Sequence, residues 1–207
     1  VVDLGCGAGF FTKAILEVVG NNGRVAAVDV QQPILDFFHS HVGQHPNLEA
    51  IKSDLCQTGL DSSQYDVAFI AFTLHEVKVA DALLEASRIL KPGGLLIIWC
   101  YSKEGNELVW KVVEPLRRRF LSRASRKMTV NISWLLTALM YPAVYTLYLP
   151  PLKKLPFYEY FQNFRKLSFY RNFLNVFDKL NAPQTDFISR ERIESWFSDK
   201  DFTDISI

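Results

Sequence analysis

The sequence has few cysteines and little excess charge, and each shortage excludes a class of protein. Only three of the 207 residues are cysteine, and Cys6, Cys56 and Cys100 form no C-x-x-C pair. This spacing argues against a disulfide scaffold and against a cysteine-rich metal site, so we expect a reducing compartment, cytoplasmic localisation and no metal. The formal net charge of +1 argues against a dominant electrostatic footprint for nucleic acid, and no nucleic-acid partner is expected.

A long disordered chain is also excluded, because 49% of the residues are hydrophobic. The length suits one domain, or one domain with an inserted subdomain, and is sufficient for a real core. The chain opens on Val1-Val2-Asp3 with neither an initiator methionine nor a signal peptide. We therefore expect a fragment that is truncated at both ends.

The small net charge hides a strong asymmetry along the chain. Residues 1–102 carry 6 basic and 11 acidic side chains, whereas residues 103–179 carry 14 basic and 5 acidic ones. The second block also holds 15 of the 28 aromatic residues. Such a shift in composition marks a different kind of surface. We predict a core over 1–102, an insert over 103–188, and a last helix and strand that return to the core over 189–207.

The first hundred residues alternate between strand-like and helix-like runs, as βαβ units with a parallel sheet do. The predicted strands are Val1–Leu4, Arg24–Val30, Leu48–Ile51, Tyr65–Phe72 and Leu95–Cys100. The predicted helices are Phe11–Val19, Pro33–His41 and Ala80–Leu90, the last stopping before Pro92-Gly93-Gly94. The strands are continuously apolar, as in sheets covered on both faces. These runs predict an α/β fold, with a doubly wound, mostly parallel Rossmann-like sheet, helices on both faces, and a helical insert after strand five.

A glycine-rich loop, Asp3-Leu4-Gly5-Cys6-Gly7-Ala8-Gly9, follows the first strand. Glycines at this spacing let the backbone turn tightly and approach a ligand closely, because no Cβ intervenes. Asp29 ends the second strand 20 residues after Gly9, where a carboxylate can accept hydrogen bonds from ribose hydroxyls. The third glycine comes one residue too early for the dinucleotide pattern G-x-G-x-x-G. A purely structural turn is the alternative interpretation.

Five motifs in order resemble those of class I S-adenosylmethionine-dependent methyltransferases. They are VVDLGCGAGFF, VAAVDV, KSDL, YDVAFIAFTLHEV and LKPGGLLII. The similarity is to the small-molecule, type 11-like branch that includes quinone and sterol methyltransferases. It covers residues 1–102 and resumes at about Ser189. The resemblance implies S-adenosyl-L-methionine as cofactor and methyl transfer to a small, hydrophobic acceptor that is quinone-, sterol- or lipid-like.

The resemblance also implies which residues bind the cofactor. The loop glycines pass under it, and Asp3 orients the loop and helps to hold the amino group. Asp29 binds the ribose hydroxyls, Val30 packs on adenine, Asp54 and the amide that follows it read the adenine edge, and Phe72 lies near the methionine end. Alternatively, Asp54 only caps a turn and Phe72 belongs to the core. The predicted set is Asp3, Gly5, Gly7, Gly9, Asp29, Val30, Asp54, Leu55 and Phe72.

A general base is needed only if the acceptor must lose a proton. Thr73-Leu74-His75-Glu76-Val77 follows the fourth strand, at the edge where ligands of open α/β sheets gather. We therefore predict His75 as the general base and Glu76 as the residue that orients it. The alternative is that both residues merely begin the next helix and line the pocket.

Two other functions stay open on the sequence. One is a nicotinamide-dependent oxidoreductase, which the glycine spacing disfavours. The other is a non-catalytic cofactor-binding module that acts through the insert. Methylation of DNA amino groups is disfavoured because Ala71-Phe72-Thr73-Leu74 replaces the acid/asparagine-Pro-Pro-aromatic tetrapeptide of those enzymes.

The insert combines charge and apolar residues in an unusual way. Residues 117–127 contain six basic and no acidic residues, and residues 128–152 contain no charge. Apolar residues in the second stretch fall on two opposite helical stripes, so such a helix needs two partners. We predict that the insert over 103–188 is a substrate lid and that its residues 117–154 bind an anionic membrane surface, with peripheral membrane association; a lid without a membrane role is the alternative.

The end of the chain provides a test of topology. Proteins that resemble this family have seven strands in the order 3-2-1-4-5-7-6. Here Ser189–Asp199 reads as the helix before strand six, with Ser189 as N-cap, and Phe202–Ile207 reads as strand six. We expect residues 202–207 either to lie beside an empty slot or to pair with Leu95–Cys100.

Overall fold

In the computed structural model the chain forms two compact units. The sheet unit comprises residues 1–105 and 186–207, and the helical unit comprises residues 106–185. The structure describes residues 1–107, 109–121, 124–148, 153–155, 158–181, 187–197 and 202–207.

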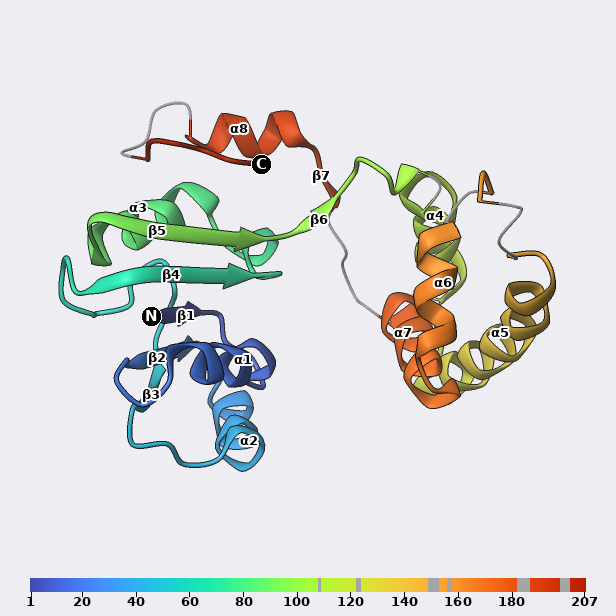
Figure 1. Cartoon of the computed structure of the whole chain (residues 1–207), viewed down its shortest axis with the longest axis horizontal. Helices are drawn as coiled ribbons and strands as arrows, with labels where there is room; N and C mark the ends of the chain where they lie inside the picture. Colours follow the sequence, from blue (N-terminus) through green and yellow to red (C-terminus); the bar gives the residue numbers. More distant parts are fainter. Residues whose placement is uncertain (108, 122–123, 149–152, 156–157, 182–186, 198–201) are drawn as a thin grey trace. The chain divides into compact units, whose positions relative to one another are not determined.

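The sheet unit is built on a five-stranded parallel sheet in the order β3-β2-β1-β4-β5 (Figure 1). Its strands are β1 (Val2–Leu4), β2 (Val25–Asp29), β3 (Leu48–Lys52), β4 (Tyr65–Ala71) and β5 (Leu90–Trp99). The short central strand β1 is buried throughout and pairs with both β2 and β4. The predicted Rossmann-like α/β fold is confirmed.

Helices cover both faces of this sheet, because alternate side chains of the strands point to opposite faces. One apolar core packs Val25 and Ala27 of β2 against helices α1 (Phe10–Val19) and α2 (Gln32–Val42). The other core packs alternate residues of β1, β2 and β4 against helix α3 (Val79–Ile89). The second core also receives Trp196 of helix α8 (Arg190–Phe197).

The predicted start of the fifth strand at Leu95 is wrong, because β5 already includes Pro92-Gly93-Gly94. Helix α3 ends at Ile89 and β5 begins at the next residue, so these three residues lie inside β5. Tyr65 pairs with Leu90 but Val67 pairs with Leu95, which shows that the extra residues form a bulge. Proline and glycine are tolerated here because residues in a bulge need not all contribute to the ladder.

Two short strands mark where the chain leaves and re-enters the sheet unit. β6 (Tyr101–Ser102) pairs in parallel with β7 (Phe187–Ile188), and the Lys103 amide donates to the Ile188 carbonyl at 3.0 Å. Helix α8 follows, with the predicted N-cap Ser189: its hydroxyl accepts from the Arg192 amide at 3.4 Å. The predicted end of this helix at Asp199 lies outside the described residues.

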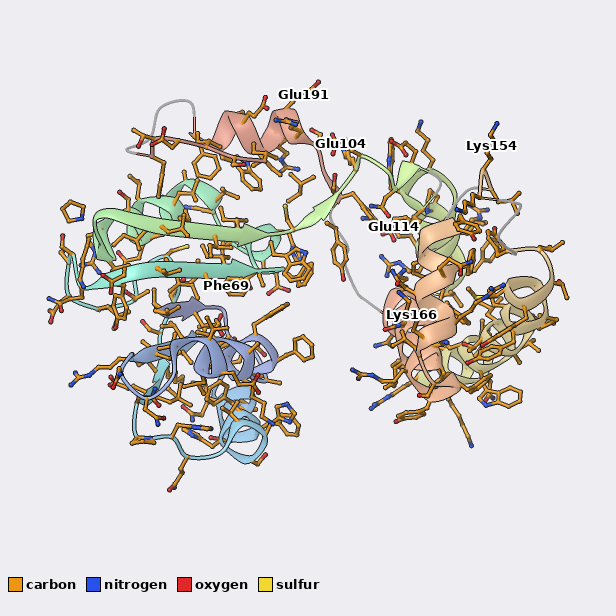
Figure 2. All side chains as sticks on the ribbon, viewed as in Figure 1. Phe69, Glu104, Glu114, Lys154, Lys166 and Glu191 are labelled. Carbon is orange, nitrogen blue, oxygen red and sulfur yellow. The ribbon has the colours of Figure 1, made fainter. Side chains whose placement is uncertain are left out.

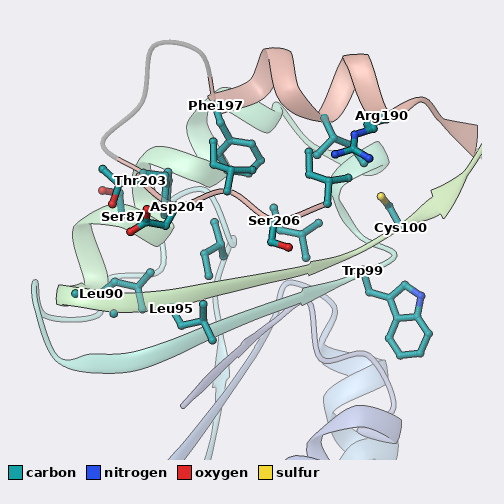
Figure 3. A pocket seen from close by; sticks show the side chains of 18 of the residues that line it. Ser87, Leu90, Leu95, Trp99, Cys100, Arg190, Phe197, Thr203, Asp204 and Ser206 are labelled. Carbon is teal, nitrogen blue, oxygen red and sulfur yellow. The ribbon is translucent and has the colours of Figure 1, made fainter.

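Residues 202–207 form no regular strand, so that part of the prediction is wrong, but the first of their two expected positions, beside an empty slot, is confirmed. Residues 202–207 are extended or bent and join no ladder in the described part of the sheet unit. A cavity of about 960 Å³ lies between them and β5. Figure 3 shows Phe197 and Cys100 directed into this cavity, whereas the Trp99 indole points to the other side of β5. Among the residues that the structure describes, this segment pairs with no strand, so its backbone groups join no ladder.

The helical unit contains three regular helices and a short irregular stretch. The helices are α5 (Arg126–Thr146), α6 (Tyr158–Lys166) and α7 (Phe169–Asn181). The stretch before them comprises π-helical turns η2 (Val109–Val113) and η3 (Arg117–Leu121) on either side of α4 (Glu114–Leu116). None of the helices in the described residues is both long and apolar enough to cross a bilayer.

Candidate functional site

The glycine loop is held against the end of β2 by backbone hydrogen bonds. The amides of Gly5 and Cys6 both donate to the Val28 carbonyl, at 2.8 and 2.9 Å, and the Gly9 amide donates to the Cys6 carbonyl at 3.0 Å. Gly5, Gly7 and Gly9 have φ values of +79°, +52° and +84°. Residues with a Cβ rarely adopt this left-handed conformation, so all three positions favour glycine.

The three glycines differ in what lies beside them. A Cβ on Gly5 would lie 2.5 Å from Thr73 Oγ1, and one on Gly9 would lie 2.2 Å from Val42 Cγ2. A Cβ on Gly7 would meet nothing within 4 Å. At Gly5 and Gly9, glycine is therefore needed because neighbouring side chains leave no room for a Cβ. Gly7 instead leaves an open side over which a ligand can approach the backbone.

Asp29 lies beside this open side, at the carboxyl end of β2. Its Oδ2 accepts a hydrogen bond from the Gly7 amide at 3.0 Å, and its Oδ1 accepts one from the Gln31 amide at 2.9 Å. Asp29 is 9% exposed. Because an ionised carboxylate offers about four acceptor positions, Asp29 retains acceptor capacity for a diol. The next residue, Val30, is 60% exposed and provides an apolar surface beside it.

Asp3 lies under the loop. It is 2% exposed, and its Oδ2 accepts a hydrogen bond from the Thr12 hydroxyl at 2.5 Å, which ties β1 to α1. Burial raises the Asp3 pKa to about 6. The hydrogen bond from Thr12 acts in the opposite direction and lowers this pKa, whereas the negative charge of Asp29 raises it further. Burial and the carboxylates of Asp3 and Asp29 also raise the pKa of Cys6. The base of the loop therefore favours a ligand with positive charge.

The raised Asp3 pKa predicts a pH-dependent stability. The folded chain binds this proton more tightly than the unfolded chain, whose carboxyl has its ordinary pKa of 3.8. The resulting stabilisation is complete below pH 3.8 and is lost as the pH rises through about 6, by roughly 2–3 kcal/mol in total. We expect Asp3→Asn to remove this pH dependence. The free energy of unfolding in urea should therefore rise for the variant relative to the wild type as the pH increases from 4 to 7. Parallel stability profiles for the two proteins would contradict the prediction.

Asp54 and Leu55 lie in a turn after β3. The Cys56 amide donates to Asp54 Oδ1 at 2.8 Å, so this carboxylate does cap a turn. Asp54 is nevertheless exposed, whereas the Leu55 side chain is buried in the core that also contains Ile70 and Leu74. Only the backbone of Leu55 is thus placed to meet a ligand. The predicted reading of adenine by this pair stays a prediction.

Phe72 belongs to a group of aromatic rings at the carboxyl ends of β4 and β5, which we call the aromatic wall. The Phe72 ring lies 4.6 Å from that of Tyr101 and 5.7 Å from that of Trp99. Its backbone has a φ of +56°, and its amide donates to the Trp99 carbonyl at 2.8 Å. The aromatic wall consists of Phe11, Phe69, Phe72, Trp99, Tyr101 and Phe187.

Sequence reasoning named only Phe72 from this group. Trp99 and Tyr101 could have been found, because they come at the end of the last predicted parallel strand, where the sheet's carboxyl edge lies. Phe11 had no comparable signal, since its spacing marks it as an ordinary core residue of α1. Its ring contacts both Phe69 and Trp99, at centroid distances of 5.3 and 5.4 Å.

His75 and Glu76 form a short 3₁₀ turn, η1 (Leu74–Glu76), before α3. The His75 Nε2 and Glu76 Oε1 atoms are 3.7 Å apart, which is too long for a hydrogen bond. The Glu76 side chain is 64% exposed and that of His75 only 16%. Thr73, directly before this turn, contacts Gly5, so the turn begins beside the glycine loop. The catalytic roles of both residues stay predictions.

Other titratable groups lie elsewhere. His39, His41 and His45 are exposed around α2, as predicted, and the His41 ring stacks on Phe37 at 5.8 Å. Among the described residues, histidine, cysteine and acidic side chains do not gather in any group of three or more that could hold a metal ion.

Comparison with known proteins identifies the type of domain. The family model described as a methyltransferase domain matches residues 2–98, just under half of the chain. Among curated proteins, the chain is similar to the ubiquinone/menaquinone biosynthesis C-methyltransferase UbiE of Ectopseudomonas mendocina. The two are 31% identical over 62% of this chain and 52% of that protein. The protein of the same name from Azotobacter vinelandii is 30% identical over 62% of this chain and 53% of that protein.

The chain thus spans about half the length of the curated relatives that it matches. Among solved structures, it is similar to a SAM dependent methyltransferase from Aquifex aeolicus, with 34% identity and a TM-score of 0.47. That match covers 50% of this chain and 56% of the other. The family match extends from the first residue of β1 almost to the end of β5, and so contains the glycine loop, Asp29 and the turn with His75. Over residues 2–98, the chain thus matches the methyltransferase domain family.

Proposed function

We propose that the chain binds S-adenosyl-L-methionine over the glycine loop and transfers its methyl group to a small hydrophobic acceptor. The observation that carries the proposal is the pairing of Asp29 with the open side of Gly7: the carboxylate holds the loop amide and keeps acceptor positions beside it. When bound, S-adenosylmethionine supplies a methyl group on a positively charged sulfonium. The chain needs to orient the two reactants and exclude water, with no nucleophile of its own.

The charge of the site supports this cofactor over a nicotinamide dinucleotide. A pyrophosphate over the loop would place negative charge near the buried carboxylates of Asp3 and Asp29. Burial and Asp29 already disfavour ionisation of Asp3, so a further anion would be poorly tolerated. A ligand with an ammonium and a sulfonium group is positively charged, so the same carboxylates would attract it. A nicotinamide-dependent oxidoreductase is therefore the weaker candidate.

The aromatic wall supports a hydrophobic, planar acceptor. Its rings follow β4 and β5 at the carboxyl edge of the sheet, where ligands of open α/β sheets bind. Trp99 and Tyr101 are 54% and 41% exposed, which is unusual for large aromatic side chains inside a folded unit. The two curated relatives are named as C-methyltransferases of ubiquinone and menaquinone biosynthesis. We therefore favour a quinone-like ring, methylated at carbon, over a sterol- or lipid-like acceptor.

Removal of a proton from such an acceptor gives His75 a role as general base. We expect His75→Gln to lower kcat by about 100-fold or more, because general-base catalysis contributes on the order of 10²–10⁴. The cofactor Kd should not change. Glu76→Gln should change kcat by less than about threefold, since its carboxylate is largely exposed and makes no hydrogen bond to His75. Equal kcat values for wild type and His75→Gln would contradict this role.

Two experiments test the function itself. Titration calorimetry of the 207-residue chain should show binding of S-adenosylmethionine and S-adenosylhomocysteine, and no binding of NAD. Incubation with methyl-labelled cofactor and a panel of quinols, sterols and lipids should then label one class, with quinols expected. Binding of NAD alone would favour the oxidoreductase. Cofactor binding without labelling of any extracted metabolite would favour the non-catalytic module.

The remaining predictions concern the helical unit and its surroundings. We propose that this unit, which falls within the predicted insert 103–188, closes over the acceptor as a lid. Cytoplasmic localisation with peripheral membrane association, through residues 117–154, is part of the same proposal. A hydrophobic acceptor dissolves in bilayers, and that is a physical reason for the enzyme to approach one.

A further inference from the structure

Helix α5 buries its small polar residues and exposes its large apolar ones. The inward face includes Thr129, Ser133 and Thr137, which are 3%, 0% and 0% exposed. The outward face is 50–60% exposed at Met128, Trp134, Leu135, Leu139 and Tyr145, the set that we call the α5 apolar face. Residues of both predicted apolar stripes thus lie on the exposed side, and the hydroxyl-bearing residues between the stripes form the buried side.

The buried hydroxyls do not need water. Ser133 Oγ donates to the Thr129 carbonyl and Thr137 Oγ1 donates to the Ser133 carbonyl, both at 2.7 Å. These hydrogen bonds give the buried hydroxyl groups partners within α5 itself. Because the side chains on the inward face are also small, a neighbouring helix can approach closely. Helix α7 packs against α5, with the Tyr141 ring 5.2 Å from that of Phe169.

This arrangement is the reverse of a helix whose outer face meets water, where large apolar residues point inward. It is typical of helices whose outer face meets lipid, where small residues lie between helices and large apolar residues face outward. An exposed face of five large apolar side chains on one helix is costly in water and marks an interaction surface.

The charge around the α5 apolar face indicates what it meets. No acidic residue occurs between Glu114 and Glu159, whereas eight basic residues do. Two of them, Arg126 and Lys127, are exposed in the first turn of α5. Lys153 and Lys154 are also exposed, and Figure 2 shows Lys154 pointing away from the helices of its unit.

Not all of the basic run is available. Arg117 is 4% exposed and its guanidinium donates to both carboxylate oxygens of Glu114, at 2.7 and 2.5 Å. Arg118 donates to the same carboxylate at 2.7 Å. The positive charge that can reach a partner therefore lies mainly at the start of α5 and after its end.

We propose that α5 lies in the headgroup region of an anionic bilayer, parallel to its surface, with the α5 apolar face inserted and Arg126 and Lys127 among the lipid headgroups. Trp134 and Tyr145 are the residue types that favour the membrane interface; both are about half exposed, although the Trp134 ring also lies 5.8 Å from that of Phe169 and the Arg165 guanidinium lies 5.3 Å from the Tyr145 ring. Pro142 inside the helix and the polar Asn131 and Thr146 on its exposed surface suit an in-plane position. The inference rests on and deepens the peripheral membrane association proposed above, and it does not depend on methyl transfer.

Vesicle sedimentation with the 207-residue chain tests the proposal. We expect binding to phosphatidylcholine vesicles that contain phosphatidylserine, much weaker binding to pure phosphatidylcholine, and a loss of binding as salt rises. Arg126→Glu with Lys127→Glu should weaken binding by at least about tenfold, since each basic residue near an anionic surface contributes about fivefold. Leu135→Glu with Leu139→Glu should weaken it by at least about tenfold as well.

Matched variants in the sheet unit serve as controls. Val18 is 88% exposed on α1, so Val18→Glu places a charge on an exposed apolar position away from α5. Lys13→Glu with Arg24→Glu reverses two exposed charges there. Both controls should bind vesicles as the wild type does. Brominated lipids should quench tryptophan fluorescence, and Trp134→Phe should remove most of that quenching.

Several results would overturn the proposal. They are equal binding to neutral and anionic vesicles, no binding by a folded wild type, or quenching that Trp134→Phe leaves intact. A wild-type dimer that Leu135→Glu with Leu139→Glu converts into a monomer, with vesicle binding unchanged, would show that a second copy covers this face. Because no assay uses S-adenosylmethionine, failure here would leave the proposed methyl transfer standing, and the reverse also holds.

Discussion

Gly9→Ala is expected to destabilise the folded chain by about 3–5 kcal/mol, which is enough to unfold many domains of this size. The new Cβ would lie 2.2 Å from Val42 Cγ2 and 2.8 Å from two ring carbons of Phe38. Both neighbours are buried, so neither can move aside without disturbing the core beneath α2. The φ of +84° adds backbone strain for any residue with a Cβ.

Gly7→Ala is the matched control, because it makes the same chemical change two residues away. Its Cβ would meet nothing within 4 Å, so only the strain of its φ of +52° remains, about 1–2 kcal/mol. The methyl group would instead occupy the open side over the loop, and S-adenosylmethionine should bind at least about tenfold more weakly. Urea unfolding and calorimetry separate the two effects. Equal stability of the two variants, or undiminished binding by Gly7→Ala, would contradict the division of roles.

Asp29→Ala is expected to weaken binding of S-adenosylmethionine by at least about 100-fold, because each hydrogen bond to a charged group contributes about 1.5–3 kcal/mol. The variant would lose the acceptor positions for the ribose hydroxyls. It would also release the Gly7 and Gln31 amides that the carboxylate now holds. Methyl transfer at low cofactor concentration should fall by the same factor.

Two further variants sharpen this test. Asp36 is an exposed acid on α2 whose Oδ1 accepts from the Gln32 side chain, so Asp36→Ala should leave cofactor binding unchanged. Asp29→Asn keeps one acceptor oxygen, but its side-chain NH₂ group would face the N–H of either Gly7 or Gln31, so one of these hydrogen bonds is lost. We expect this variant to bind S-adenosylmethionine nearly as poorly as Asp29→Ala. A folded Asp29→Ala protein with wild-type affinity would remove the main support for the proposed function.

Sequence alone was sufficient for the features that depend on local pattern. Continuous apolar runs predicted all five strands of the sheet, since buried parallel strands are apolar along their whole length. The glycine loop and Asp29 could be placed together because the loop directly follows one strand and Asp29 ends the next, and the carboxyl ends of parallel strands share one edge. The N-cap at Ser189 followed from the same kind of local signal.

Tertiary structure decided everything that depends on a neighbour. Proline and two glycines at residues 92–94 favoured a strand that starts only at Leu95, but pairing with β4 begins at Leu90 and makes these residues a bulge. Phe202–Ile207 has the composition of a strand, yet a strand exists only where another lies beside it, and a cavity occupies that position. In the loop, Thr73 and Val42 distinguish the packed glycines from the open Gly7, although the three look alike in sequence.

Helix α5 shows the same limit most clearly. Its apolar residues surround the helix, so periodicity could not determine which side is buried. Packing within the helical unit decided it: the side with small hydroxyl residues is buried, and most of the large apolar surface is left outside. The hydrophobic pattern thus predicted that this helix needs partners. Only the packing in the folded structure determined which of its faces stays exposed.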